Sequence, residues 1–412
     1  MTERPGGSDV GRSETQAVRQ ADGSWSVSGF KWFSSATDSD ITLLLARGQD
    51  AQGNVVESSR GLSLFFGYVR QEDGKLNGIR IQRLKNKFGT KALPTAELEL
   101  DNMKAILVGA EGRGIPTVST ILNITRIWAG ITCSAAMRRA VNIARDYATR
   151  REACFFFFFP LLHYVLGTEA SVLFLCRHLV VCSAINPCIW PHSPIWSLRP
   201  AQPSCFPMMW PSFLARCTQV FTITYIFYKC ACSETNTGTK DDEALLRLLT
   251  PIVKLYVSKQ SIVIVSEGME ALGGQGYIED TGLARILRDT FVNSIWEGTT
   301  NILSLDVLRV FSSSKQSLDL MAQRILALQA NAGSVNIDSK PIKAAVQTIS
   351  QYIEGASNHG KDTVEAGARQ LAFALARTYC AALLVDHAVF TKVFVLIYYY
   401  FFFFKSNISG GR

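Results

Sequence analysis

Two short features in the last third of the chain have residue types that could do chemistry. Three glycines within four positions, Gly273, Gly274 and Gly276, follow an apolar run. Glycine lets the backbone turn tightly and approach another group closely. Further along, one carboxylate, Glu297, stands between Trp296 and a glycine. An apolar neighbour desolvates a carboxylate and makes it a stronger proton acceptor, which suits a general base.

The residues after Glu297 predict a helix, because Ile302, Leu305 and Leu308 recur at helical spacing. Glu297 is therefore expected in the turn before that helix. A simpler interpretation stays open on spacing alone: the glycines only end a helix, and Glu297 is a solvated residue near a helix N-terminus.

The literal residues resemble the C-terminal catalytic region of the acyl-CoA dehydrogenase family, most closely the branch of the bacterial alkylation-response acyl-CoA dehydrogenases. In that family a GG-x-GY segment contributes to the FAD site, and an [IVL]-[YW]-E-G-[TS] segment carries the catalytic glutamate. The resemblance implies that Glu297 removes the α-proton of an acyl-CoA. It implies a substrate contact for Gly298, and FAD contacts for Gly273, Gly274, Gly276, Thr299 and Asn301.

The first third of the chain has short apolar or alternating runs at 25–31, 41–46, 61–69 and 95–100, separated by Gly, Asp and Asn. Such runs predict a small antiparallel sheet or barrel, which by itself would be a binding module.

Three segments of this part also resemble the family. They are a T-E-x-x-G-G-S-D segment, a G-x-K-x-[FW]-x-[ST] segment and a basic segment at 83–91 that otherwise reads as a surface turn. The resemblance implies that Ser8 contacts the thioester ligand, that Phe33 covers the flavin ring and that Ser35 hydrogen-bonds near flavin N5.

Residues 115–153 predict a long helix or a helix pair. Arg126 lies in its apolar part, where a lone arginine is often a snorkelling surface residue. In the family's D-x-x-R pattern this arginine contacts CoA, and here Asn123 replaces the acidic residue. Arg151 matches the FAD-binding arginine of a Y-A-x-x-R-x-x-F-G segment, although Cys154 then breaks that motif.

Residues 154–232 do not fit the family. Only five charged residues occur between Phe155 and Cys232, and eight of the thirteen prolines cluster there, so no helical or strand period persists. We interpret the segment as an atypical insertion with the composition of a translated intron. A membrane span is the alternative, but charges and prolines interrupt every candidate. The apolar tail 388–412 looks similar, and Lys392 shortens its candidate anchor at 389–404.

Together these patterns predict an α+β fold, with a small antiparallel β-barrel or sheet domain followed by an all-α helical-bundle domain. The expected domains are a β-domain at 1–114, a helical domain at 115–153 and 233–312, and additional helices at 313–387. Within the second, 244–265 predicts a helix with Pro251 at a boundary or kink near its start. The family's N-terminal helical domain is missing from the sequence, which we interpret as a truncated gene model or a fragment.

Composition adds little to the choice of function. A net charge of +8 fits an anionic ligand such as FAD or a CoA thioester. The sequence has no dense Lys/Arg stripe of the kind that indicates nucleic-acid binding. The cysteines and histidines lack metal-ligand spacing, so no metal is expected. Cytoplasmic, mitochondrial and peroxisomal locations all remain open.

The resulting hypothesis is FAD-dependent α,β-dehydrogenation of an acyl-CoA, with Glu297 as base and hydride transfer to flavin N5. By the resemblance, an electron-transfer flavoprotein would accept the electrons and the protein would be a homo-oligomer. The alternatives are a catalytically impaired or non-enzymatic flavoprotein fragment of the same family, or a membrane-associated interaction protein.

Overall fold

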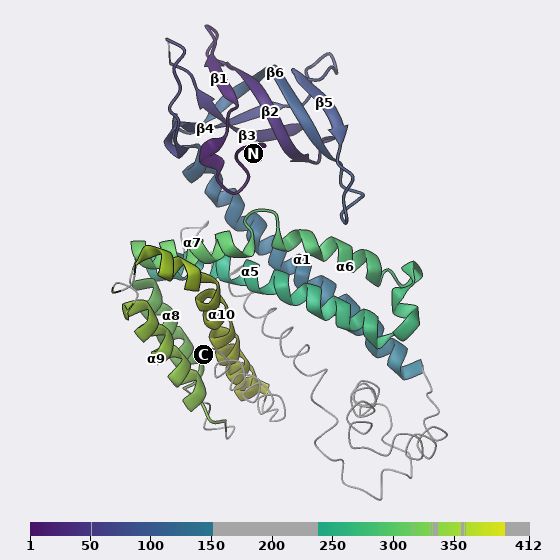
Figure 1. The fold of residues 1–412 in the computed structure, drawn as a ribbon, viewed down its shortest axis with the longest axis vertical. Helices are drawn as coiled ribbons and strands as arrows, with labels where there is room; N and C mark the ends of the chain where they lie inside the picture. The colour runs from purple at the N-terminus through teal and green to yellow at the C-terminus, as the bar shows by residue number, and fades with distance from the viewer. Residues whose placement is uncertain are drawn as a thin grey trace, which may run out of the picture. The chain divides into compact units, whose positions relative to one another are not determined.

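The computed structural model describes residues 1–150 and 238–391, except for residues 51, 315, 331, 333–336, 356–357 and 359. Arg151, the segment 154–232 and the tail from 392 onward lie outside the described residues. The chain divides into two compact units, one formed by 1–125 with 297–299 and the other by 126–296 with 300–412. Figure 1 shows the first as strands and the second as helices.

The β unit has six strands, of which five close into a barrel. In the ring order β2-β1-β3-β4-β6, strand β6 pairs again with β2, and β5 pairs with residues 96–100 of β6. All pairings are antiparallel except β1–β3, which is parallel, so the prediction of a purely antiparallel sheet was wrong at this one pair. The strands are β1 Gln16–Arg19, β2 Trp25–Ser35, β3 Ile41–Gly48, β4 Leu62–Tyr68, β5 Ile79–Leu84 and β6 Thr95–Val108.

The four predicted strands are present, whereas β1 and β5 were missed. β5 buries only its first residue, so it has no apolar alternation to detect. In β2 the core follows the two-residue period, with Trp25 and Val27 buried, whereas β3 and β4 each bury four consecutive residues. The Trp25 ring meets Phe65 edge-on at 5.3 Å between centroids.

The helical unit contains the remaining elements in chain order. They are α1 Gly114–Arg150, α5 Lys240–Ala271, α6 Leu283–Phe291, α7 Thr300–Ser313, α8 Gln316–Leu328, α9 Lys340–Gly355 and α10 Lys361–Thr391. The long helix predicted after residue 115 is one continuous helix, α1, whose first turns belong to the β unit. α8 and α9 both pack against α10 (Figure 1). Gly360 directly precedes α10.

Helix α5 is the core of this unit. It contacts α6, α7, α8 and α10. A capping box at Thr239 and Asp242 starts the helix, four residues before the predicted start. Of the two alternatives predicted for Pro251, a boundary or a kink, the boundary was wrong, because Pro251 lies inside the helix. Its buried position within a packed bundle overrides the loss of one backbone donor. α5 is long and apolar enough to cross a membrane, but 78% of its most apolar window is buried inside the protein.

Helix α7 forms where expected, but it buries a different face. Its buried apolar residues are Leu303, Val307, Val310 and Phe311, whereas the predicted stripe of Ile302, Leu305 and Leu308 is only partly buried. Apolar residues occur almost all round this helix, so spacing alone could not select the face that packs against α5.

Candidate active site

Glu297 lies in a tight turn between the short 3-10 helix Val292–Ser294 and α7. Its φ is 55°, a left-handed value that is unusual for a residue with a side chain, and Gly298 follows with φ 107°. The Oε2 atom of Glu297 is buried, and no described residue donates a hydrogen bond to it. A buried acceptor without a donor is rare and marks a place where strain or an incoming ligand is expected.

Two groups hold the residues before Glu297. The backbone N–H groups of Ile295 and Trp296 both donate to the carbonyl of Val292, at 2.9 and 3.0 Å. The ammonium of Lys254, on α5, donates to the carbonyl of Trp296 at 2.6 Å. Sequence reasoning missed Lys254, although a lysine inside the apolar run Ile252–Tyr256 was a visible signal.

The glycine turn follows directly after α5, as the 3-10 helix Gly273–Tyr277. Gly273 and Gly276 each have a structural reason to be glycine, whereas a side chain at Gly274 would have room. Gly273 has φ +60°; a Cβ on Gly276 would lie 1.9 Å from the carbonyl oxygen of Met269; and a Cβ on Gly274 would meet nothing within 4 Å. Gly273, Gly274 and Tyr277 are exposed. The turn therefore presents open backbone to solvent, as a phosphate-binding or nucleotide-binding turn requires.

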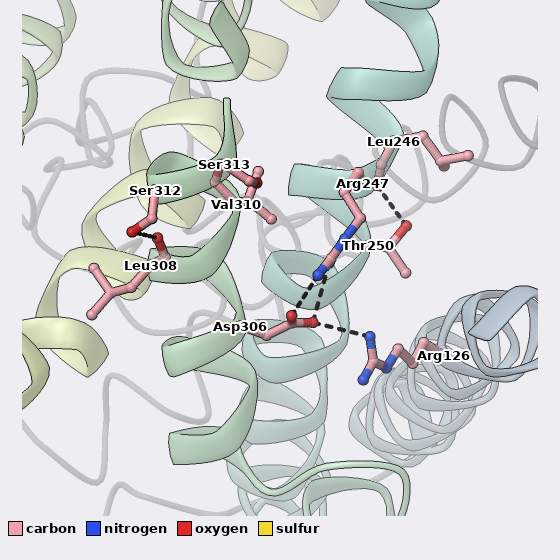
Figure 2. Close-up of polar contacts among 9 residues, drawn as sticks. All are labelled: Arg126, Leu246, Arg247, Thr250, Asp306, Leu308, Val310, Ser312 and Ser313. Carbon is pink, nitrogen blue, oxygen red and sulfur yellow. Dashed lines mark hydrogen bonds and ion pairs between the residues drawn. The ribbon is translucent and has the colours of Figure 1, made fainter. Parts of the chain in front are cut away.

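Arg126 forms part of a charged cluster between three helices (Figure 2). Asp306 of α7 accepts two bonds from Arg247 of α5, at 2.6 and 3.1 Å, and one from Arg126 of α1 at 3.2 Å. Burial acts to raise the pKa of Asp306, but the bonds with Arg247 and the charge of Arg126 lower it below its ordinary value. Arg126 is mostly buried in this ion pair, so it is not a snorkelling surface residue.

Asp306 gives Arg126 the acidic partner that is missing at position 123, where the D-x-x-R pattern has Asn123 instead. Asn123 is partly buried on the same helix as Arg126, three residues earlier. Asp306, 180 residues further along the chain, accepts the Arg126 hydrogen bond. Sequence reasoning could not find this partner, since no local pattern connects the two residues.

Asn301, in the first turn of α7, has a partner from the C-terminal helices. Its side-chain oxygen accepts a hydrogen bond from Nη1 of Arg369 at 3.1 Å, and the Arg369 guanidinium lies 5.8 Å from the centre of the Phe373 ring. Asn301 and Arg369 are both exposed. Thr299 is partly buried, in the same turn as Glu297.

In the β unit, Phe33 and Ser35 share strand β2. The Phe33 ring is 49% exposed and packs edge-on against Trp32 at 6.2 Å, with the Lys85 ammonium 4.8 Å from its centre. The Ser35 hydroxyl lies 2.9 Å from the Thr95 hydroxyl on β6. Ser8 is exposed, in a bend directly before the residue that caps a short 3-10 helix.

The basic segment at 83–91 has local structural partners. Arg83 and Lys85 both pair with Glu97 of β6, at 2.8 and 2.6 Å. The Lys87 ammonium donates to the carbonyls of Thr90 and Leu93, each at 2.6 Å. These contacts support the interpretation of the segment as a structural turn.

A buried ion pair anchors the N-terminal segment to the barrel. The Lys31 ammonium contacts Glu3 at 2.5 Å and the carbonyl of Leu45 at 2.8 Å. Glu3 also accepts from the backbone of Glu14 and Thr15. Burial acts to raise the pKa of Glu3, but the Lys31 charge and these hydrogen bonds lower it below its ordinary value.

Comparison with known proteins gives three family-model matches along the chain. The model "Acyl-CoA dehydrogenase, middle domain" matches residues 1–103. "Acyl-CoA dehydrogenase, C-terminal domain" matches 219–311, and "Acyl-CoA dehydrogenase 11 C-terminal domain-like" matches 306–393.

Individual relatives agree with these matches. Acyl-CoA dehydrogenase family member 11 of Caenorhabditis elegans is 40% identical over 94% of this chain and 58% of its own length. Putative acyl-CoA dehydrogenase AidB of Escherichia coli is 28% identical over 93% of this chain and 61% of its own. The crystal structure of C. elegans ACDH-11 in complex with C11-CoA has a TM-score of 0.79 at 38% identity, covering 94% of this chain and 60% of that one. The chain thus spans about three-fifths of these relatives.

Proposed function

Since this chain belongs to the acyl-CoA dehydrogenase family, we propose that it catalyses the FAD-dependent α,β-dehydrogenation of an acyl-CoA thioester. Members of the family are FAD flavoproteins and oxidoreductases that act on the CH–CH bond of acyl-CoA. The observation that carries the proposal is the Glu297 turn: a carboxylate in a left-handed turn, with one buried oxygen that accepts no hydrogen bond from the described residues.

Glu297 is the proposed base. Its buried oxygen takes the proton from the α-carbon of the thioester, and the left-handed backbone at Glu297 fixes the direction of that oxygen before substrate arrives. Gly298 follows at φ 107°, a conformation that only glycine adopts easily. A glycine at this position therefore preserves the turn that holds Glu297 next to the substrate.

The residues available for the cofactor fit a flavin nucleotide. Phe33 presents a half-exposed aromatic face, and the open backbone at Gly273 and Gly274 leaves room for a close approach. When bound, FAD supplies the redox chemistry by accepting the β-hydrogen as hydride. We propose that Phe33 and Ser35 contact the flavin ring, and that the following residues hold the rest of the nucleotide: Arg151, Gly273, Gly274, Gly276, Thr299 and Asn301.

The residues proposed for acyl-CoA are Ser8, Asn123, Arg126 and Gly298. Among the described residues, the Asp306 cluster joins two arginines to one carboxylate, and this excess of positive charge favours an anionic ligand such as CoA. The C. elegans relative is described in complex with C11-CoA, which supports an acyl-CoA as substrate. We further propose a homo-oligomer that passes electrons to an electron-transfer flavoprotein.

The proposal is tested on the purified chain by its visible absorbance, without oxygen, before and after addition of C11-CoA. The expected result is a flavin spectrum that bleaches on addition, with formation of the corresponding 2-enoyl-CoA. A flavin spectrum that C11-CoA and shorter saturated acyl-CoAs leave unchanged contradicts the proposal. A colourless protein that cannot be reconstituted with FAD would favour the alternative of a non-enzymatic family fragment.

A further inference from the structure

Among the described residues of the helical unit, Lys254 is the one charged side chain that is completely buried. It is 0% exposed in the middle of α5, with Val253 and Leu255 as neighbours. Lysine is almost never fully buried, because removing an ammonium from water costs several kcal/mol unless other groups compensate. Its presence in the core therefore needs a specific reason.

The structure provides that reason at the Trp296 carbonyl. The Lys254 ammonium donates to this oxygen at 2.6 Å, a distance typical of a strong charge-assisted hydrogen bond. The carbonyl belongs to the peptide bond that joins Trp296 to Glu297. The lysine thus fixes the orientation of the peptide from which the left-handed conformation of Glu297 begins.

Lys254 lies near a group of buried polar side chains. Ser258 and Ser261 of α5 are fully buried, Asn293 of the preceding 3-10 helix is 3% exposed, and Cys133 of α1 lies 4.0 Å from the Ser258 hydroxyl. Burial raises the pKa of the Cys133 thiol, while hydrogen bonds with Ser261 and Ser258 and the charge of Lys254 act in the opposite direction. The lysine is therefore part of a polar layer between α1, α5 and the segment before Glu297.

We propose that Lys254 is a positioning residue, which acts through the Trp296 carbonyl to aim the Glu297 carboxylate at the α-proton. The inference rests on the proposed function, since it assigns Lys254 a role in the same proton transfer. In this role the lysine acts only through the backbone, by holding the peptide bond that precedes the base. A misplacement of the reacting atoms by about 1 Å can lower a rate about 100-fold.

The test is Lys254→Met, which keeps the length of the side chain and removes the donor and the charge. Lys259→Met is the matched control, since Lys259 lies on the same helix and is only partly buried. We expect Lys254→Met to lower kcat per bound flavin about 100-fold while KM for the acyl-CoA changes less than about twofold. The isotope effect on kcat with α-deuterated acyl-CoA should rise above the wild-type value, and Lys259→Met should match wild type in all three quantities.

The isotope effect separates positioning from a general loss of structure. A variant that is merely less stable, or contains less FAD, has fewer active molecules, but each of them shows the wild-type isotope effect. Wild-type kcat per flavin and a wild-type isotope effect in Lys254→Met would overturn the inference.

If Lys254→Met does not retain flavin, Lys254→Gln, which keeps a neutral N–H donor, is measured in the same way. Loss of flavin in both variants would also overturn the inference, because the lysine would then maintain the whole fold. A wild-type protein that fails to oxidise acyl-CoA would contradict the proposed function itself, and this outcome is visible before any Lys254 variant is made.

Discussion

At the scale of single residues, residues of the same type lie in different environments and therefore have different roles. Gly273, Gly274 and Gly276 form one motif, yet only Gly276 has a neighbour that forbids a side chain. Glu297 and Glu3 are both carboxylates with buried oxygens. Glu3 is surrounded by donors, whereas one oxygen of Glu297 receives no hydrogen bond from the described part of the chain. The environment, and not the residue type, separates a structural carboxylate from a candidate base.

Gly276→Ala should destabilise the helical unit by about 2 kcal/mol or more, because the new Cβ would lie 1.9 Å from the carbonyl oxygen of Met269 and the backbone must shift. Gly274→Ala is the control; its Cβ meets nothing within 4 Å, so its effect should stay within about 0.5 kcal/mol. Thermal unfolding of both variants measures the difference. Equal stability of the two would show that the turn relaxes freely.

The Glu3–Lys31 pair should behave as a coupled unit. Glu3→Gln leaves the Lys31 ammonium buried without its carboxylate and should cost about 3 kcal/mol of unfolding free energy. Adding Lys31→Met removes the isolated charge, so the double variant should be more stable than Glu3→Gln alone. Urea unfolding of Glu3→Gln, of Lys31→Met and of the double variant gives the coupling energy. Simple additivity of the two single effects would rule out the coupling.

At the scale of elements, side chains from distant parts of the chain hold the helices around the candidate site. Asp306 of α7 joins Arg247 of α5 and Arg126 of α1, as Figure 2 shows. Arg369 of α10 reaches Asn301 at the start of α7. Helix α7, which begins three residues after Glu297, is therefore held from several sides.

Asp306→Asn should reduce the stability of the helical unit by about 2 kcal/mol at neutral pH, because two arginines lose their shared carboxylate. The pKa of Asp306 in the folded protein lies below its ordinary value of 3.8. Its stabilising contribution is thus complete above that value and disappears as the pH falls through the lower folded value.

The difference in unfolding free energy between wild type and Asp306→Asn should therefore shrink as the pH is lowered below 3.8. Asp319→Asn, at an exposed aspartate of α8, serves as control and should change stability little at any pH. A difference for Asp306→Asn that stays constant into the acid range would show that the ion pair does not supply the stability.

The sequence predicted the elements better than the contacts between them. Hydrophobic spacing located α1, α5 and α7 and placed additional helices in the region of α8, α9 and α10, and short apolar or alternating runs located four of six strands. These patterns failed where they do not show which residues are buried: β5 buries one residue, Pro251 lies inside a packed helix, and α7 has apolar residues on nearly every face. The motif residues were identified by resemblance, but Asp306, Arg369 and Lys254 were not, because each meets its partner across a long sequence separation.

At the scale of the whole molecule, the chain pairs a barrel that carries Phe33 and Ser35 with a helical unit that carries the glycine turn and α7. The chain spans about three-fifths of its curated relatives, so the activity of the complete protein is a proposal from these parts. The family models nevertheless match both units in family order, from the middle domain to the C-terminal helices. The proposed reaction requires one base, which takes the α-proton, and one flavin, which takes the β-hydrogen as hydride.

The most direct test of this account is Glu297→Gln, which keeps the size of the side chain and removes the base. The variant should bind FAD as wild type does, and its flavin absorbance should stay unchanged when C11-CoA is added to an oxygen-free solution, while wild type bleaches. Glu270→Gln, at an exposed carboxylate near the end of α5, should bleach like wild type. Bleaching of Glu297→Gln at the wild-type rate would contradict the account, because another group would then remove the α-proton.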